Sequence, residues 1–451
     1  MVKYFKFKIC GNCIVEKSFF KSLLPPFKEQ EQKVQILKKQ CILKEGMYYF
    51  DWTASGLAAL CIESRIQNIL PFYANTHSES SKHSEIMGGI YQNSRAIISK
   101  SFGLDENFAV ISCGFGSSAA IKKFQEIMGI YIPPKTKQIL GDSLKSLELP
   151  LVIIGPFEHH SNELSFREGL CEVVRIPLNE YGLVDLEYLE VVLKQNKGRK
   201  IVASFTLVSN VSGIIAPFVE ISNLVRSYGG IMCYDMASSS AYFDIPCDFY
   251  DAAFLSPHKL LGGVCSSGVL IIKRALIDKT LSPTFCGGGV VGYVSRISAR
   301  YFANEEAREE AGTPGILEFI RGGLAYLLRD EVDKHWILEY KEEIAKSFKE
   351  FLGNEKNIIS YGNLDYNALG IFSFNIINKS PYEMAKILSQ EYGILVRAGC
   401  SCAGPYGHDL LELEDNQTFL QKPGWIRVSL HYTHTYKDVE YLCNALKRLC
   451  R

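Results

Sequence analysis

Short apolar runs recur along the middle of the chain, and each is bounded by Gly, Pro, Asn or Asp. Between residues 108 and 274 they read FAVISCGFG, LPLVIIGPFEHH, KIVASFTLVSNVSG, GGIMCYDMASS, YDAAFLSPHK and SGVLIIKR. Runs of this length and composition predict buried strands. Helical patterns such as FVEISNLVRSYGG separate several of them. The sequence therefore predicts a mainly parallel sheet with helices on both faces.

A second set of elements follows a polar helical stretch at residues 330–353. It comprises LGIFSFNII, the helix PYEMAKILSQEYG, ILVRAG, WIRVSLHY and the final helix YKDVEYLCNALKRL. This mixture predicts a smaller α+β domain. We expect three parts: an N-terminal extension of unknown role at residues 1–45, a large domain at 46–330 and a small C-terminal domain at 331–451.

Composition narrows the class of partner. The 451 residues include 49 Lys+Arg and 49 Asp+Glu, so net charge gives no reason to expect a nucleic acid or an anionic membrane. We find no run of the roughly 18 to 20 apolar residues that a membrane span needs. Many of the 14 cysteines lie in apolar runs, where a reduced thiol behaves as a small hydrophobic group. These features favour a cytoplasmic protein.

Polar residues that follow the predicted strands are the candidates for chemistry, because ligands of open α/β sheets gather at the carboxyl ends of strands. Gly116-Ser117-Ser118 opens a helix, which offers free N–H groups and a favourable dipole to a phosphate. Asp235 ends one strand and Lys259 follows another. Taken singly, these residues could be a helix cap, a salt-bridge partner and a solvated lysine. Together they indicate a pyridoxal phosphate site, where lysine binds the aldehyde and aspartate keeps the ring nitrogen protonated.

The chain resembles the class V aminotransferase superfamily of fold-type I pyridoxal phosphate enzymes, and within it the cysteine desulfurase and selenocysteine lyase group. The motifs that carry the resemblance run in the family's order from Tyr48 to the C-terminus. They are YFDWTAS, GFGSSAA, FEHHSN, VSNVSG, YDMASSSAYFDIP, DFYDAAFLSPHKLLGG, CGGGVV, REEAGTP, VRAGCSCAGP and IRVSLHYTHTYKDVEYL. The resemblance implies a large pyridoxal phosphate-binding domain with a seven-stranded, mainly parallel sheet between helices. A smaller C-terminal α+β domain would carry Cys402 and Arg427.

The resemblance also implies a role for each matching residue. Lys259 would bind the cofactor covalently and later accept the Cα proton, Asp235 would pair with the pyridine nitrogen, and His159 would stack on the ring and help to move protons. Asn210 would lie near the ring O3′ and the substrate carboxylate, which Arg427 would bind through its fork. The residues that would hold the phosphate are Ser117, Ser118, Ser256 and His258, with Thr313 reaching the phosphate of a neighbouring subunit in a homodimer.

Cys402 distinguishes between activities within this superfamily. It stands where Suf-type desulfurases keep the cysteine that accepts sulfur, and Arg397 nearby would favour its thiolate. We therefore expect a pyridoxal phosphate-dependent cysteine desulfurase, which converts L-cysteine to L-alanine, forms a persulfide on Cys402 and passes the sulfur to an acceptor, commonly a protein. The alternative for Cys402 is an inert packing cysteine.

Departures from the family pattern keep other activities open. Ser238 replaces the usual Gln that contacts the ring O3′, and Cys400 adds a second thiol beside Cys402. A selenocysteine lyase, another Cβ-lyase, an epimerase, an aminotransferase or a catalytically silent scaffold remains an alternative. We expect no metal site, because Cys10 and Cys13 lack a second Cys-x-x-Cys pair and HYTHT at residues 431–435 favours a turn.

Overall fold

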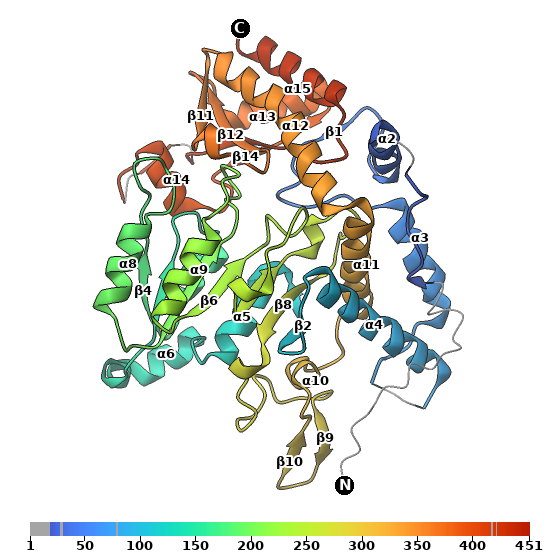
Figure 1. Cartoon of the computed structure of the whole chain (residues 1–451), viewed down its shortest axis with the longest axis vertical. Helices are drawn as coiled ribbons and strands as arrows, with labels where there is room; N and C mark the ends of the chain where they lie inside the picture. The colour runs from blue at the N-terminus through green and yellow to red at the C-terminus, as the bar shows by residue number, and fades with distance from the viewer. Residues whose placement is uncertain (1–18, 28–29, 78–79, 416–417, 421) are drawn as a thin grey trace.

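The chain folds into two unequal parts, a larger one around a central sheet and a smaller one that contains the C-terminus (Figure 1). The computed structural model describes residues 19–27, 30–77, 80–415, 418–420 and 422–451. Cys10 and Cys13, considered above as a metal motif, lie outside the described residues. No helix in these ranges is both long and apolar enough to cross a membrane.

The central sheet has seven strands in the order β2-β8-β7-β6-β5-β3-β4. Only β8 runs antiparallel to its neighbours, β2 and β7. This topology confirms the predicted α/β fold with a seven-stranded, mainly parallel sheet. The strands are β2 (Phe108–Phe115), β3 (Leu151–Ile154), β4 (Glu172–Arg175), β5 (Ile201–Thr206), β6 (Ile231–Asp235), β7 (Ala252–Leu255) and β8 (Ser267–Lys273).

Alternate residues of each strand feed two separate apolar cores. In β2, Phe108 and Val110 belong to one core while Ala109 and Ile111 belong to the other, as the two-residue period of a strand requires. Both faces are therefore buried, which explains the continuous apolar runs in the sequence. The helices of the first core include α3 (Leu60–Ile69), α4 (Lys82–Ser101), α8 (Leu186–Gln195), α9 (Phe218–Ser227) and α11 (Ile316–Val332), and those of the second include α5 (Gly116–Ile127) and α7 (His160–Arg167).

The smaller part is built on a four-stranded antiparallel sheet in the order β11-β12-β15-β14. Its last helix begins with a capping box, in which Thr435 and Asp438 satisfy each other's backbone N–H groups. The elements of this part are α12 (Lys334–Asn354), β11 (Ile358–Tyr361), β12 (Ile371–Ile376), α13 (Pro381–Tyr392), β13 (Ile394–Leu395), β14 (Arg397–Gly399), α14 (Gly404–Leu411), β15 (Trp425–Ser429) and α15 (Tyr436–Leu449).

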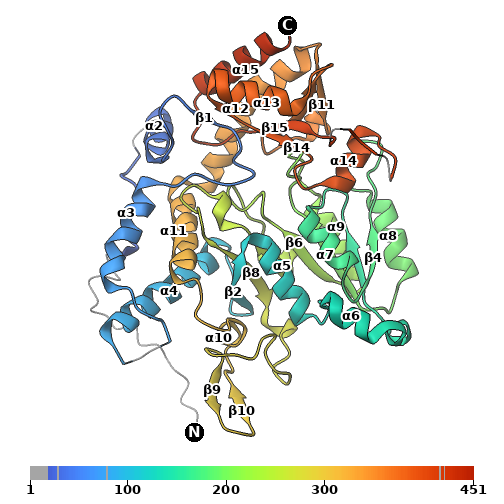
Figure 2. The same ribbon diagram turned by 180° about the vertical axis from the view of Figure 1, so that it is seen from behind.

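Residues 30–49 pack on the smaller part (Figure 2). Helix α2 (Gln30–Gln40) contacts α15 through an ion pair of 2.7 Å between Lys38 and Asp438. Strand β1 (Tyr48–Tyr49) runs parallel to β13. Directly after β1, the Phe50 carbonyl accepts the Ser429 N–H at the end of β15 at 2.8 Å, so residues 48–50 are held against the smaller part.

Several short elements complete the structure. A hairpin of β9 (Val291–Val294) and β10 (Ala299–Tyr301) projects from the larger part, on the side away from the smaller part (Figures 1 and 2). Helix α6 (Pro134–Leu140) precedes β3, and α10 (Glu305–Glu309) follows the hairpin. The 3-10 turns are η1 (Leu70–Phe72), η2 (Gly141–Ser146), η3 (Cys247–Phe249), η4 (Pro257–Lys259), η5 (Arg274–Leu276) and η6 (Leu364–Tyr366).

Candidate functional site

A cavity of about 420 Å³ lies at the carboxyl ends of the central strands, beneath the smaller part. Eleven of the twelve site residues predicted from the sequence line it: Ser117, Ser118, His159, Asn210, Asp235, Ser238, Ser256, His258, Lys259, Cys402 and Arg427. Thr313 does not. The structure thus brings together residues that are up to 310 positions apart, from Ser117 to Arg427.

The floor of the cavity near α5 is shaped to accept an anion. Gly116 opens the helix with φ +59°, and a Cβ added there would lie 2.9 Å from His258 Cε1 and 3.3 Å from Ser256 Oγ. The Ser117 N–H donates to Ser256 Oγ at 2.9 Å, so the serine hydroxyl is already held at the helix N-terminus. Only glycine avoids this crowding, and the N–H groups at the start of α5 lie at the positive end of the helix dipole, which favours an anion such as a phosphate.

Lys259 and Asp235 form the charged centre of the cavity. Burial lowers the pKa of Lys259 to about 8, against the opposing attraction of Asp235. Burial also raises the pKa of Asp235, while the Ala237 N–H, which donates to its carboxylate at 2.9 Å, and the charge of Lys259 lower it. A lysine with this pKa is partly neutral near pH 8, and a neutral amine is the form that attacks an aldehyde or accepts a proton.

His159 contributes an uncharged ring to the cavity wall. Burial, followed by the charge of Lys259, lowers the pKa of His159 to about 3. Its Nδ1 accepts the Ser161 N–H at 3.1 Å, so this nitrogen carries no proton and the neutral ring has its proton on Nε2. A neutral imidazole fixed in this way can stack on an aromatic ring and exchange a proton from the free nitrogen.

Arg427 is fully buried but keeps one donor unused. Its Nη2 donates to Asp51 Oδ1 at 2.8 Å and its Nη1 donates to the Asn210 carbonyl at 3.1 Å. The Nε atom, the Asn210 side-chain oxygen and the hydroxyl of Ser266 are buried without a partner, and all three residues line the cavity. Buried polar atoms seldom lack partners, so this wall is suited to a polar ligand.

Cys402 lies in a tight turn at the edge of the same cavity. The Ala403 N–H donates to the Cys400 carbonyl at 3.1 Å, and both central residues have positive φ, +55° at Ser401 and +57° at Cys402. Positive φ at both positions defines a primed turn, which ordinarily favours Asn and Gly. The turn leaves the Cys402 side chain only partly buried. A reachable thiol therefore faces the cavity that contains Lys259.

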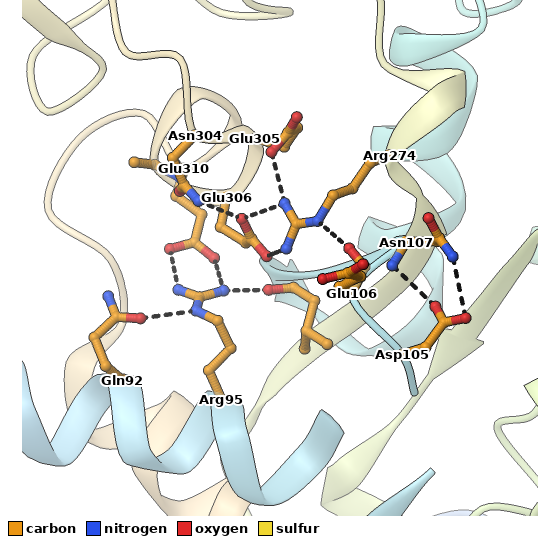
Figure 3. Close-up of polar contacts among 12 residues, drawn as sticks. Gln92, Arg95, Asp105, Glu106, Asn107, Arg274, Asn304, Glu305, Glu306 and Glu310 are labelled. Atoms are coloured by element: carbon orange, nitrogen blue, oxygen red, sulfur yellow. Dashed lines mark hydrogen bonds and ion pairs between the residues drawn. The ribbon is translucent and has the colours of Figure 1, made fainter. Parts of the chain in front are cut away.

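Thr313 is exposed and receives a 3.2 Å hydrogen bond from the Asn75 amide. The segment before it is strongly anchored: Arg95 binds both carboxylate oxygens of Glu310 at 2.8 and 2.9 Å (Figure 3). Glu310 also accepts the Ser112 N–H at 2.6 Å. Thr313 is thus held at the surface of its own chain, outside its own cavity.

The sequence reasoning missed some groups at the site. Asp51 lies in the motif YFDWTAS, where the sequence indicates no role for it, yet it is the ionic partner of Arg427. Thr206 and Cys265 also line the cavity, and their only sequence signal was a position at or between predicted strands. The turn at residues 431–434 agrees with the predicted turn, and there the ring of His431 stacks on Trp52 at 3.5 Å.

The donor set of the cavity suits pyridoxal phosphate. Within the described ranges, no group of three or more His, Cys, Asp or Glu side chains is arranged to hold a metal. The anion cradle at Gly116, the buried lysine and the buried aspartate match the phosphate, aldehyde and ring nitrogen of pyridoxal phosphate.

Open α/β sheets bind their ligands at the carboxyl edge, and the anion cradle, buried lysine and buried aspartate found there fit an enzyme that uses pyridoxal phosphate. The chain belongs to the aminotransferase class-V family, whose model matches residues 48–442. Members of that family depend on pyridoxal phosphate, and the resemblance inferred from the motifs is confirmed at this level.

Individual relatives carry a more specific name. The chain is 29% identical over 427 residues to a probable cysteine desulfurase of Pyrococcus abyssi, covering 92% of this chain and 97% of that protein. It is 30% identical over 310 residues to a cysteine desulfurase of Shigella flexneri, covering 66% and 71% of the two chains. The apo structure of a cysteine desulfurase from Thermococcus onnurineus superposes with a TM-score of 0.78 at 23% identity, covering 95% of this chain and 99% of that one. The last comparison supports the fold.

Proposed function

We propose that the protein is a cysteine desulfurase that converts L-cysteine to L-alanine and receives the sulfur on Cys402 as a persulfide. One observation carries the proposal: the partly exposed thiol of Cys402 lines the same cavity as Lys259 and Arg427. The relatives named cysteine desulfurase support the same substrate. An aminotransferase or an epimerase would need no thiol at this position, because neither reaction breaks the bond between Cβ and sulfur.

Each part of the cavity has a task in this reaction. Residues of the anion cradle would hold the phosphate, Asp235 would keep the ring nitrogen protonated and His159 would cover one ring face. Pyridoxal phosphate, when bound, withdraws electrons from the Cα atom of an attached amino acid. Ser238 is the one departure among these contacts, since its hydroxyl is shorter than the usual glutamine.

Arg427 and Lys259 act on the amino acid itself. Asp51 and the Asn210 carbonyl fix the guanidinium of Arg427, so it is ready to bind the substrate carboxylate without reorganising. Burial lowers the pKa of Lys259 to about 8. Its amine is therefore a base of suitable strength to remove the Cα proton near neutral pH.

The electrons of the sulfur-transfer step balance without an external oxidant. The Cys402 thiolate attacks the sulfur of the substrate, an S–S bond forms and the Cβ–S bond breaks. The electron pair of the broken bond remains with the carbon skeleton, which takes up protons and leaves as alanine. The products are alanine and the Cys402 persulfide, and a reducing thiol or an acceptor protein later removes the terminal sulfur.

Alanine formation from L-cysteine by the cofactor-loaded protein tests this proposal, with and without a reducing thiol. Cys402→Ala should abolish alanine formation while it preserves the absorbance of the bound cofactor. Cys400→Ala is the matched control, because Cys400 belongs to the same turn, and it should retain activity. Normal alanine formation by Cys402→Ala would refute the proposed sulfur acceptor. Conversion of the cofactor to its amine form, with dependence on a keto acid, would instead reveal an aminotransferase.

We also propose that the enzyme works as a homodimer in which Thr313 approaches the partner's cavity. Support comes from exposed apolar side chains around the hairpin, where Tyr293, Val294 and Ile297 are 51%, 60% and 96% exposed. Phe115 at the cavity wall is 91% exposed. A second copy that covers these groups would remove a large apolar surface from water.

The remaining parts of the proposal concern organisation and location. We propose a large domain at residues 46–330 that binds the cofactor and a small domain at 331–451 that supplies Cys402 and Arg427, with a protein as the sulfur acceptor. The described cysteines are all free thiols, which is consistent with work in the cytoplasm.

A further inference from the structure

His160 contacts the Cys402 turn in two ways. Its backbone N–H donates to the Cys402 carbonyl at 2.8 Å. Its ring Nε2 accepts the Gly404 N–H, also at 2.8 Å. One residue of the larger part thus holds the two peptide groups on either side of Ala403, the first of which contains the Cys402 carbonyl.

The backbone around this contact is adapted to it. A Cβ at position 404 would lie 2.9 Å from His160 Nε2, so glycine is needed for the close approach. The Gly404 N–H can only donate, so Nε2 must be unprotonated and the proton of the neutral ring lies on Nδ1. A third bond, from Asn210 Nδ2 to the Ser401 carbonyl at 2.7 Å, ties the other end of the turn to the larger part.

His160 also links the turn to the cofactor side of the cavity. It is the first residue of α7, directly after the cavity-lining His159. Because the two residues are consecutive at a helix N-terminus, the position of the His159 ring and the position of the Cys402 turn share one rigid support. The positive φ values at Ser401 and Cys402 are uncommon for residues with side chains, so the turn needs such external bonds to persist.

We propose that His160 is a positioning residue for sulfur transfer: through its N–H and Nε2 it fixes the Cys402 turn at the distance from the bound amino acid that attack on sulfur requires. This inference rests on the proposed desulfurase function. His160 itself touches neither substrate nor cofactor. Its loss should therefore impair the step performed by Cys402 and spare the steps performed by Lys259 and Arg427.

The ionisation state of the ring supports this role at neutral pH. Burial, followed by the positive charges of Lys422 and Arg167, lowers the pKa of His160 below its ordinary value of 6.5. The ring of His159, whose centre is 6.2 Å away, is neutral as well. The acceptor Nε2 is therefore available to Gly404 throughout the neutral range and is lost only in acid.

The test compares His160→Ala with His160→Gln in the full-length, cofactor-loaded protein. Gln places an acceptor oxygen at a reach similar to that of Nε2, whereas Ala places none. Misplacement of a reacting group by about 1 Å can cost about 100-fold in rate. We expect His160→Ala to lower kcat for alanine about 10- to 100-fold, with KM for L-cysteine within about twofold, and His160→Gln to recover most of the loss.

A second readout is independent of turnover. Alkylation of Cys402 by iodoacetamide in the cofactor-free protein, followed by mass spectrometry, reports how freely the turn opens. His160→Ala should raise the alkylation rate of Cys402 at least about threefold, and Gly404→Ala should do the same because it breaks the same bond from the other side. His335→Ala, at an exposed histidine of α12, is the control and should change nothing.

The outcomes separate the two proposals. If wild-type protein forms no alanine, the desulfurase proposal fails, and the alkylation rates still decide whether His160 holds the turn. If wild-type protein is active and His160→Ala matches it in both kcat and alkylation rate, the positioning role is refuted. A loss of activity in His160→Ala that Gln does not restore would also overturn the acceptor role of Nε2.

Discussion

Gly116 offers a quantitative test of the anion cradle. Gly116→Ala places a methyl group 2.9 Å from His258 Cε1 and 3.3 Å from Ser256 Oγ, on a residue with φ +59°. The left-handed backbone costs an alanine about 1–2 kcal/mol. Crowding in a packed site adds about 1–3 kcal/mol. We therefore expect Gly116→Ala to lose about 2–5 kcal/mol in the free energy of unfolding.

A matched variant separates the two contributions. Gly103 has nearly the same φ, +61°, and a Cβ there would meet nothing within 4 Å. Gly103→Ala should therefore lose only the backbone cost of about 1–2 kcal/mol. If His258 and Ser256 move aside to admit the methyl group, the phosphate contacts are lost instead, and the dissociation constant for pyridoxal phosphate should rise about 10- to 100-fold, at about 1.4 kcal/mol for each factor of ten.

The measurements are urea unfolding of both cofactor-free variants and absorbance titration with pyridoxal phosphate. Gly103→Ala should bind the cofactor as wild type does, because Gly103 does not line the cavity. The reasoning is refuted if the two variants lose the same stability and bind pyridoxal phosphate equally well. That result would mean that the space beside Gly116 is not needed for the phosphate.

Three further predictions follow from the same site. Lys259→Met should raise the melting temperature of the cofactor-free protein at pH 7, because burial lowers the pKa of Lys259 from 10.5 to about 8. This gain in melting temperature should shrink between pH 8 and 10.5, where Lys259 of the folded protein has already lost its proton. A gain that stays constant with pH in thermal melts would contradict this reasoning. Arg427→Lys should raise KM for L-cysteine about tenfold or more in alanine assays, because lysine lacks the carboxylate-binding fork, and an unchanged KM would exclude Arg427 as the carboxylate site. Ile297→Asp, which places a charge on a side chain that is 96% exposed at the hairpin, should shift sedimentation from dimer to monomer, and a dimer of undiminished affinity would remove the hairpin from the proposed interface.

The sequence was most informative where both faces of an element are buried. Strands β3, β5 and β6 have continuous apolar runs because each contributes side chains to both cores, so their positions followed from the pattern. Strand β4 was not among the predicted runs, because only Val173 and Val174 of its four residues are apolar. Two apolar residues are too short a run to predict a buried strand, whereas β2, at the opposite edge of the sheet, has a longer apolar run and was predicted.

The site was predictable in its members but not in its internal contacts. Lys259 and Asp235 could be found because each follows a strand, and the topology of a parallel sheet brings strand ends together. The pairing of Asp51 with Arg427 joins residues 376 positions apart, and neither strand periodicity nor a local motif specifies such a pair. The same holds for His160 and Gly404, 244 positions apart, whose contact depends on how the two parts of the chain pack.

Because both parts of the chain contribute residues to the cavity, the way they are joined affects the proposed reaction. Arg427 lies on β15, and we propose that it binds the carboxylate of cysteine. The Cys402 turn directly follows β14. Strand β14 pairs with β15 in a register that sets Arg397 opposite Arg427. Arg427 is therefore held by the sheet of the smaller part. The Cys402 turn lies beyond the end of β14 and is held instead by contacts with the larger part, among them those of Asn210 and His160. Loosening those contacts should leave the amino acid bound to Arg427 but move the Cys402 thiol relative to the sulfur of the substrate. We therefore expect sulfur transfer, rather than substrate binding, to be the step most sensitive to how the two parts are joined.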